Sequence, residues 1–207
     1  MCHPQGSVRV RSRLTQSRLA LGVYGLTYRW TLDFIPRRLH LPYVLNHRRL
    51  LGVGYEVGVK TGEYSEWLLA HWNGERLVSV DAWSAELDPD VTQTEHEASF
   101  GRTRERLARC GDRSEIWRAE STRVAARVRP ASADFVYIDA RHEYGSVSAD
   151  IAAGLPRIRP GGLLAGHDYH DGERYGQAYG VKRAVDELCI DYGLEITLTR
   201  RDYPEQS

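Results

Sequence analysis

Short apolar runs alternate with longer segments of mixed polarity from residue 50 of the chain onward. The runs have strand length, and apolar residues recur at helical spacing in the longer segments, so the pattern predicts strands and helices in turn. The expected strands are 53–57, 77–80, 115–118, 135–138, 163–165 and 194–198. The expected helices are 63–71, 92–109, 122–128 and 181–191, with a further helix carried by apolar positions 144, 147, 151, 155 and 158. This order is typical of an α/β fold with a doubly wound, mostly parallel sheet.

A glycine-containing turn follows the first expected strand. Gly52 and Gly54 suggest a dinucleotide-binding fingerprint, but the third glycine, Gly58, comes one position too late for G-x-G-x-x-G. The better frame is Glu56-x-Gly58-x-x-x-Gly62, directly before an expected helix. Because glycine has no Cβ, such a turn can bring bare backbone and a helix N-terminus against a ligand.

Acidic residues lie at corresponding places along the expected sheet. One acid ends or closely follows each of the second to fifth strands, namely Asp81, Glu120, Asp139 and Asp168. In parallel sheets, ligands bind outside the carboxyl ends of the strands, where the strand order reverses. These acids and the glycine turn are therefore predicted to line one ligand site.

Five segments in this order resemble the class I S-adenosylmethionine-dependent methyltransferases. The segments are 56–62, 78–83, 135–144, 159–169 and 180–186. More narrowly, they look like the small-molecule O-methyltransferase group related to macrocin O-methyltransferase and the cephalosporin-hydroxylase-like proteins. The resemblance covers about residues 50 to 200. It implies a Rossmann-like fold and S-adenosylmethionine as the cofactor.

The resemblance also implies which residues bind the cofactor. Glu56, Gly58 and Gly62 would meet the methionine portion of S-adenosylmethionine through backbone amides and the following helix N-terminus. Asp81 would accept hydrogen bonds from both ribose hydroxyls, because a carboxylate has two oxygens.

Three further residues fall where this fold holds the adenine. Trp83 either covers the adenine face or is an ordinary core or surface aromatic. Glu120 and Ser121 either read the adenine edge, or Ser121 is a plain cap of the next helix.

The resemblance places Asp139 beside the methyl-transfer centre, in contact with the cofactor. In the resembling families, acids at the positions of Asp139 and Asp168 hold a divalent ion, usually magnesium, which polarises a substrate hydroxyl. His167 stands where some relatives carry a second acid, and imidazole suits later transition metals better than magnesium. The expected metal ligands are Asp139, His167 and Asp168. The alternative is that the two acids orient the substrate and His167 only donates a hydrogen bond.

His142 lies three residues past Asp139, before an expected helix. As a catalytic residue it is a general base or a substrate-orienting group, since a histidine pKa of about 6.5 suits removal of a hydroxyl proton. The alternative is a loop histidine that caps the next helix. The glycine- and tyrosine-rich segment 169–179 is expected to be a loop that acts as a lid or sets substrate specificity.

Composition narrows the class of partner. Twenty-eight basic residues balance twenty-eight acidic ones, so no net field draws the chain to nucleic acid or to a membrane surface. Three scattered cysteines form neither a metal-ligand spacing nor a disulfide framework, which favours a reducing cytoplasm. No apolar run approaches the ~20 residues of a membrane span, and no signal peptide is expected.

A domain boundary is predicted near residue 50. Residues 50–207 form the methyltransferase-like domain, and residues 1–49 form an arginine-rich extension, which is either a solvated lead-in or an anion-facing cap or subunit contact. Its segment 39–50 is expected to be a helix over the cofactor cleft. This fold usually closes with an antiparallel strand after the last expected one. Either the region of Tyr203 supplies that strand, or the N-terminal segment or a second copy in a homodimer covers the edge.

Three functions remain open from the sequence. The resemblance favours transfer of a methyl group from S-adenosylmethionine to a hydroxyl of a small-molecule acceptor. A non-catalytic binding protein that kept the cofactor fold is the second. A nicotinamide-dependent oxidoreductase is the third, and it lacks the G-x-G-x-x-G that such enzymes use.

Overall fold

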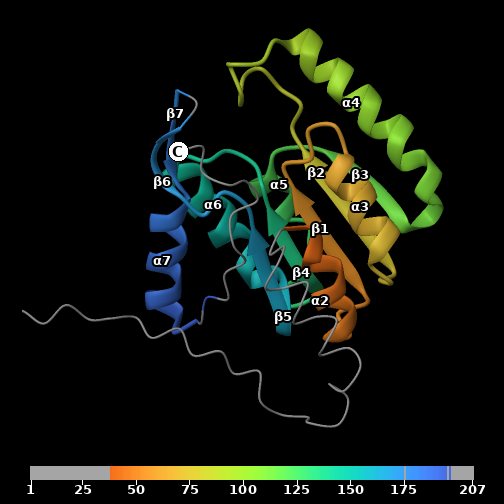
Figure 1. Cartoon of the computed structure of the whole chain (residues 1–207), viewed down its shortest axis with the longest axis vertical. Helices are drawn as coiled ribbons and strands as arrows, with labels where there is room; N and C mark the ends of the chain where they lie inside the picture. Colours follow the sequence, from red (N-terminus) through yellow and green to blue (C-terminus); the bar gives the residue numbers. More distant parts are fainter. Residues whose placement is uncertain (1–37, 175, 195, 197–207) are drawn as a thin grey trace, which may run out of the picture. The chain divides into compact units, whose positions relative to one another are not determined.

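The computed structural model describes residues 38–174, 176–194 and 196 (Figure 1). Residues 41–187 form one compact unit built on a five-stranded parallel sheet with the order β3-β2-β1-β4-β5. The order reverses between β1 and β4, which confirms the predicted doubly wound α/β fold. The strands are β1 (Val53–Val57), β2 (Arg76–Asp81), β3 (Ser114–Arg118), β4 (Ala133–Ile138) and β5 (Ile158–Gly166).

Helices cover both faces of the sheet. Adjacent residues of a strand point to opposite faces of the sheet. The contacts of two adjacent residues of β2 therefore show which helices cover each face. Ser79 of β2 donates to Ser65 of α3, whereas Val80, its neighbour, packs against Val124 of α5. Helix α4 contacts α3, and helix α6 contacts α5. The helices are α2 (Leu41–His47), α3 (Glu63–His71), α4 (Gln93–Leu107), α5 (Ser121–Ala125), α6 (Tyr144–Gly154) and α7 (Val181–Tyr192), with 3-10 turns η1 (Arg38–His40), η2 (Ala108–Arg113) and η3 (Leu155–Arg157).

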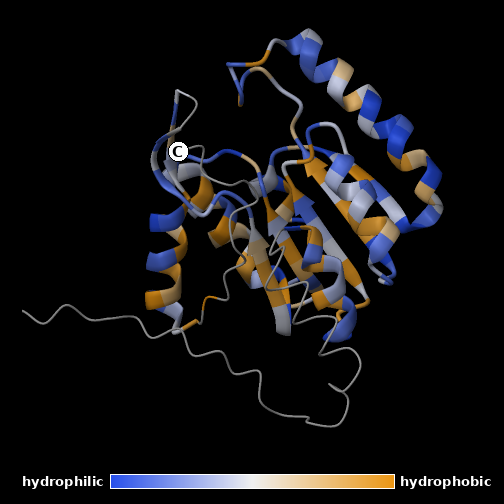
Figure 2. Cartoon of the chain, viewed as in Figure 1, coloured by the Kyte–Doolittle hydropathy of each residue, from blue (hydrophilic) through white to orange (hydrophobic). Residues whose placement is uncertain are grey.

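The core lies between the sheet and its helices. Hydrophobic residues are concentrated in the strands, and α4 is mostly hydrophilic (Figure 2). All six residues of β4 are buried, as expected for a central strand covered on both faces. Within the described part of the chain, no helix has both the length and the apolar character that a membrane span requires.

The sequence pattern places several elements correctly and misplaces others. The predicted bounds of β1 and α3 are confirmed. The helix expected to reach residue 158 ends at Gly154, and Ile158 instead begins β5. Pro156, in η3, lacks the N–H that would continue the helix. The segment Pro160-Gly161-Gly162, which precedes the expected strand 163–165, lies inside β5 at an irregularity in its register with β4.

The segment predicted as the loop 169–179 contains a β-hairpin. Its strands are β6 (Asp171–Arg174) and β7 (Gln177–Gly180), which pair antiparallel as a separate two-stranded sheet. The loop prediction is therefore wrong for most of the segment. The predicted last strand, 194–198, and the region of Tyr203 lie largely outside the described residues.

Helix α2 does not lie over the expected cofactor cleft. Its Asn46 donates to the carbonyl of His71 and accepts from the N–H of Asn73, each at 2.8 Å. These partners are at the C-terminal end of α3, which begins at the carboxyl end of β1 and therefore ends at the opposite edge of the sheet. In this segment Leu50 is buried, whereas Tyr43 is 41% exposed. The cleft position predicted for this helix is wrong.

Candidate active site

The glycine turn is packed closely against neighbouring parts of the protein. Gly58 has a φ of +88°, and a Cβ there would lie 2.1 Å from the backbone oxygen of Asp139. Gly62 has a φ of +77°, and a Cβ there would lie 3.1 Å from Cγ2 of Thr103 in α4. The N–H groups of the two glycines donate to the carbonyls of Val80 and Val59. These two glycines therefore serve the fit of the turn against β4 and α4, and their own amides are used within the protein.

Asp81 fastens the same turn to the end of β2. Its Oδ2 accepts from the N–H groups of Val59 and Lys60, and its Oδ1 accepts from the N–H of Trp83, all at 2.9 Å. A carboxylate offers about four lone-pair sites, so these bonds occupy most of its capacity. Hydrogen bonds to both ribose hydroxyls, as predicted for Asp81, would require the turn to release one or more of them.

Trp83 is a core aromatic in this structure. Its side chain is 1% exposed, and its Nε1 donates to the carbonyl of Lys60 at 2.8 Å. The ring lies 4.8 Å from that of Phe100 in α4, between centroids. Of the two interpretations of Trp83, the structure therefore supports the ordinary core aromatic, because a ring this buried has no face available to an adenine.

Glu56 is equally enclosed. It is 1% exposed, and its Oε2 accepts from Ser65 of α3 at 2.5 Å. Ser65 in turn accepts from Ser79 of β2 at 3.0 Å. The carboxylate therefore holds α3 on the sheet, and any effect of Glu56 on a cofactor is exerted through the turn that joins β1 to α3.

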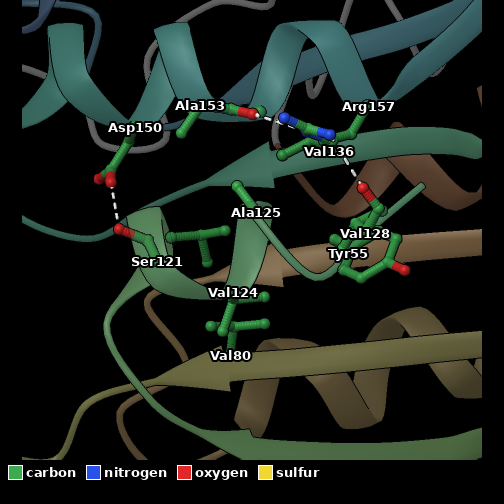
Figure 3. Close-up of a pocket in the computed structure, with 12 residues that line it drawn as sticks. Tyr55, Val80, Ser121, Val124, Ala125, Val128, Val136, Asp150, Ala153 and Arg157 are labelled. Carbon is green, nitrogen blue, oxygen red and sulfur yellow. Dashed lines mark hydrogen bonds between the residues drawn. The ribbon is translucent and has the colours of Figure 1, made fainter. Parts of the chain in front are cut away.

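Ser121 and Glu120 occupy the start of α5, and neither side chain caps it. Ser121 donates instead to the buried Asp150 of α6, next to a cavity of about 30 Å³ between these helices and the sheet (Figure 3). Burial raises the pKa of Asp150, and the hydrogen bond from Ser121 opposes that rise. Glu120 pairs with Arg123 at 3.2 Å. The interpretation of Ser121 as a helix cap is wrong, and its contact with adenine stays a prediction.

Four polar residues converge where β4 and β5 end. Nε2 of His142 lies 3.1 Å from Oδ2 of Asp168 and 3.8 Å from Oδ1 of Asp139. Nδ1 of His167 lies 3.0 Å from Oδ2 of Asp168 and 3.7 Å from Oδ1 of Asp139. One ligand atom from each of Asp139, His142 and Asp168 lies within 4.8 Å of the others. The expected metal ligands therefore meet, and His142, expected only as a base or an orienting group, joins them.

The sheet fixes the backbone of this cluster. The N–H of Asp139 donates to Val57 at 2.8 Å, and the N–H of His167 donates to Ile138 at 3.1 Å. The ladder therefore continues one residue past β4 and one residue past β5, which brings the two acids to neighbouring positions. Asp168 has a φ of +53°, a conformation that is costly for a residue with a side chain and that is often found at functional sites.

The charges of the cluster shift its proton equilibria. Asp139 and Asp168 raise the pKa of His142 from 6.5 to about 9, and burial opposes this rise. Burial acts to raise the pKa of Asp168, but the adjacent His142 and His167 outweigh it and hold that pKa well below its usual range. Nε2 of His142 is buried and close to two carboxylates, yet it is not aligned for a hydrogen bond with either. His142 is therefore an imidazolium at neutral pH when only the two acids face it.

An aromatic ring that the sequence pattern did not single out completes the site. Tyr179 of β7 stacks on the ring of His142 with 4.6 Å between centroids and 7° between planes. The next residue, Gly180, donates its N–H to the carbonyl of His142 at 2.8 Å. The available signal was the Gly- and Tyr-rich composition of the segment, which does not indicate which tyrosine faces the site.

Comparison with known families decides the identity of the fold. A family model described as a methyltransferase domain matches residues 55–169, more than half of the chain. The chain belongs to this methyltransferase family. The matched region includes the glycine turn, Asp81 and the cluster at the ends of β4 and β5. A comparison of the methyltransferase with curated proteins finds no match.

Solved structures share the fold of the methyltransferase at low sequence identity. An O-methyltransferase from Bacillus cereus in complex with SAH has a TM-score of 0.55 and 17% identity, covering 86% of this chain and 82% of that chain. The O-methyltransferase TomG from Streptomyces achromogenes, in complex with SAM, has a TM-score of 0.54 and 19% identity, covering 88% and 82%. These likenesses confirm the class I methyltransferase fold.

The raised pKa of His142 should make the stability of the protein depend on pH. A pKa raised from 6.5 to about 9 contributes stability that is fully present below pH 6.5 and is lost as the pH rises through about 9. With metal chelated, the melting temperature of the wild type should therefore fall more steeply between these pH values than that of His142→Gln. Thermal unfolding followed by circular dichroism measures the two slopes. Replacing the exposed His47 of α2 by glutamine is the control, and equal slopes for wild type and His142→Gln would contradict the expectation.

Proposed function

We propose that the methyltransferase moves a methyl group from S-adenosylmethionine to a hydroxyl of a small molecule. The observation that carries the proposal is the convergence of Asp139, His142 and Asp168 at the strand ends beside the glycine turn. In a methyltransferase domain, this group of charges lies where an acceptor oxygen can be oriented and deprotonated. The two O-methyltransferases with the same fold, which were solved with SAH or SAM, support the choice of cofactor and of oxygen as the acceptor atom.

The donors in the cluster fit a divalent cation. Asp139 and Asp168 supply carboxylate oxygens, and His142 supplies a buried Nε2 that faces both acids without an aligned hydrogen bond. His167 places Nδ1 beside the same two carboxylates. A set that mixes imidazole with carboxylate suits manganese, iron, cobalt or zinc better than magnesium. A cation bound there would stabilise the deprotonated acceptor oxygen near neutral pH.

The reaction is an in-line displacement. The acceptor hydroxyl gives up its proton to solvent water, and its oxygen forms a bond to the methyl carbon. The bond from carbon to sulfur breaks with its electron pair going to sulfur, which leaves S-adenosylhomocysteine. The main task of the protein is to hold oxygen, methyl and sulfur in line. His142, with its pKa raised to about 9, cannot take the proton at neutral pH while only the acids face it. In that state it orients the acceptor by donating a hydrogen bond, and it becomes a base only at higher pH.

One set of observations favours a second function, a non-catalytic protein that kept the fold. Asp81, Trp83 and the two glycines of the turn are all engaged by the protein itself. Hydrogen bonds from both ribose hydroxyls to Asp81 would therefore require the release of at least one of the three N–H groups that now donate to it. The nicotinamide alternative has no such support, because the family match is to a methyltransferase domain.

Titration with S-adenosylhomocysteine in a calorimeter tests the proposal. The wild type is expected to bind, and Asp81→Ala is expected to weaken binding about 10- to 100-fold, because it removes the anchor of the turn and a charged hydrogen-bond acceptor, worth roughly 1.5–3 kcal/mol. Asp112→Ala, at an exposed position of η2, serves as the control. Absence of binding at millimolar ligand would contradict methyl transfer and favour the non-catalytic function.

A further inference from the structure

The β6–β7 hairpin is fastened to the loop that carries His142. The N–H of Gly180 donates to the carbonyl of His142 at 2.8 Å. The N–H of Lys182 donates to the carbonyl of His170 at 3.2 Å, which joins the two ends of the hairpin. A Cβ on Gly180 would lie 2.7 Å from the backbone nitrogen of Tyr144, so the end of β7 lies directly against the start of α6. The backbone directly after Tyr179 is therefore held in a fixed relation to His142.

The ring of Tyr179 lies against the imidazole of His142, whose rotation the backbone contact leaves free. Rotation about χ2 of histidine has a broad profile, so a main-chain hydrogen bond does not by itself fix the plane of the imidazole. An almost parallel ring at 4.6 Å does fix it. In the observed plane, Nε2 faces the space between Asp139 and Asp168.

The hairpin is also connected to the cofactor side of the site. Gln177 of β7 donates to Asp90 at 3.3 Å, and Arg141, next to His142, donates to the carbonyl of Leu87 at 2.8 Å. Both partners belong to the connection between β2 and α4, which begins directly after Asp81. The strand that carries Tyr179 and the loop that carries His142 are thus tied to the same neighbouring segment.

We propose that Tyr179 is a positioning residue that holds the His142 imidazole in the plane from which Nε2 faces Asp139 and Asp168. The inference rests on the proposed function, because that function explains why the orientation of His142 matters. It assigns Tyr179 and the β6–β7 hairpin a part in the same site. The aromatic ring is the part that acts. Phenylalanine is therefore sufficient at position 179, and an aliphatic residue is not.

The experiment compares Tyr179→Phe with Tyr179→Leu in the full chain. The carbon-bound ring protons of His142, assigned by their loss in His142→Gln, should resonate upfield in the wild type because the imidazole is stacked on the tyrosine ring. Tyr179→Phe should keep this shift, and Tyr179→Leu should lose it while the protein remains folded. Tyr192→Leu, which removes a 65% exposed tyrosine from α7, is the matched control and should change nothing at His142.

A second measurement connects the ring to the cluster. With Mn²⁺ as the probe, Tyr179→Leu should lose about tenfold in affinity, as expected when a residue that orients a ligand is removed, and Tyr179→Phe should stay within about twofold of the wild type. An upfield shift that persists in Tyr179→Leu, or a loss of affinity in Tyr179→Phe equal to that of Tyr179→Leu, would overturn the proposal. If the wild type binds no Mn²⁺, the cation part of the proposed function fails, and the ring protons still test Tyr179.

Discussion

Replacing Gly58 by alanine is expected to abolish binding of S-adenosylhomocysteine and to destabilise the fold by about 3 kcal/mol or more. The new Cβ would lie 2.1 Å from the backbone oxygen of Asp139, and the φ of +88° is itself unfavourable for alanine. Backbone cannot turn aside as a flexible side chain can, so the turn or the end of β4 must move. Either movement displaces Asp139 from its place beside Asp168.

The control for this variant is Gly101→Ala. Gly101 lies within α4, and a Cβ there meets nothing within 4 Å. Alanine in a helix is favoured over glycine by about 0.5–1 kcal/mol, so this variant should be as stable as the wild type or more so. Urea unfolding and calorimetry with S-adenosylhomocysteine measure both proteins. A Gly58→Ala protein with wild-type stability and affinity would show that the turn has more room than the structure gives it.

Replacing Asp139 and Asp168 together by asparagine is expected to remove divalent-cation binding, with a loss of at least about 100-fold in affinity. Each substitution keeps the shape of the side chain and removes the negative charge that a divalent cation requires. The same change removes the groups that raise the pKa of His142, so that pKa should return toward 6.5 from about 9. Calorimetry with Mn²⁺ measures the first effect, and an NMR titration of the His142 ring measures the second.

Asp112→Asn is the matched control for these two substitutions, since Asp112 is exposed on η2 and lies outside the cluster. It should leave both cation affinity and the His142 titration unchanged. Wild-type affinity in the double variant would place any cation elsewhere. An unchanged pKa of His142 in that variant would show that the two acids are not its main electrostatic partners.

Local sequence patterns were sufficient to predict an element where its bounds depend only on residues within or next to it. The run 53–57 and the helix 63–71 have the observed bounds because their apolar spacing is clear and because Gly58 and Gly62 mark the end of the strand and the start of the helix. The pattern failed where a neighbour decides the outcome. Ile158 fits the helical spacing of α6, but Pro156 prevents that helix from continuing. Ile158 instead pairs with Ala133 of β4 as the first residue of β5. The polar, glycine-rich segment 169–179 was predicted as a loop, but two parts of it pair with each other as the strands of a hairpin.

The candidate site divides in the same way. The strand-end rule identified Asp139 and Asp168, because the end of a parallel strand can be read from a single apolar run. It did not identify the rotation of Trp83 into the core, the use of Asp81 by the amides of the turn, or the stacking of Tyr179 on His142. Each of these depends on residues that are distant in the chain.

The sequence by itself determined the order of the elements from β1 to β5, the doubly wound sheet and the edge at which acids collect, since these follow from periodicity and from the chirality of strand–helix–strand units. Only the tertiary structure decided which side chains reach one another. It brought His142 into the group with Asp139 and Asp168, and it engaged the N–H groups of Gly58, Val59, Lys60 and Gly62 within the protein itself. The physical reason is that hydrogen bonds and ion pairs act over a few ångströms. Whether two residues meet therefore depends on packing, which no spacing along the chain encodes.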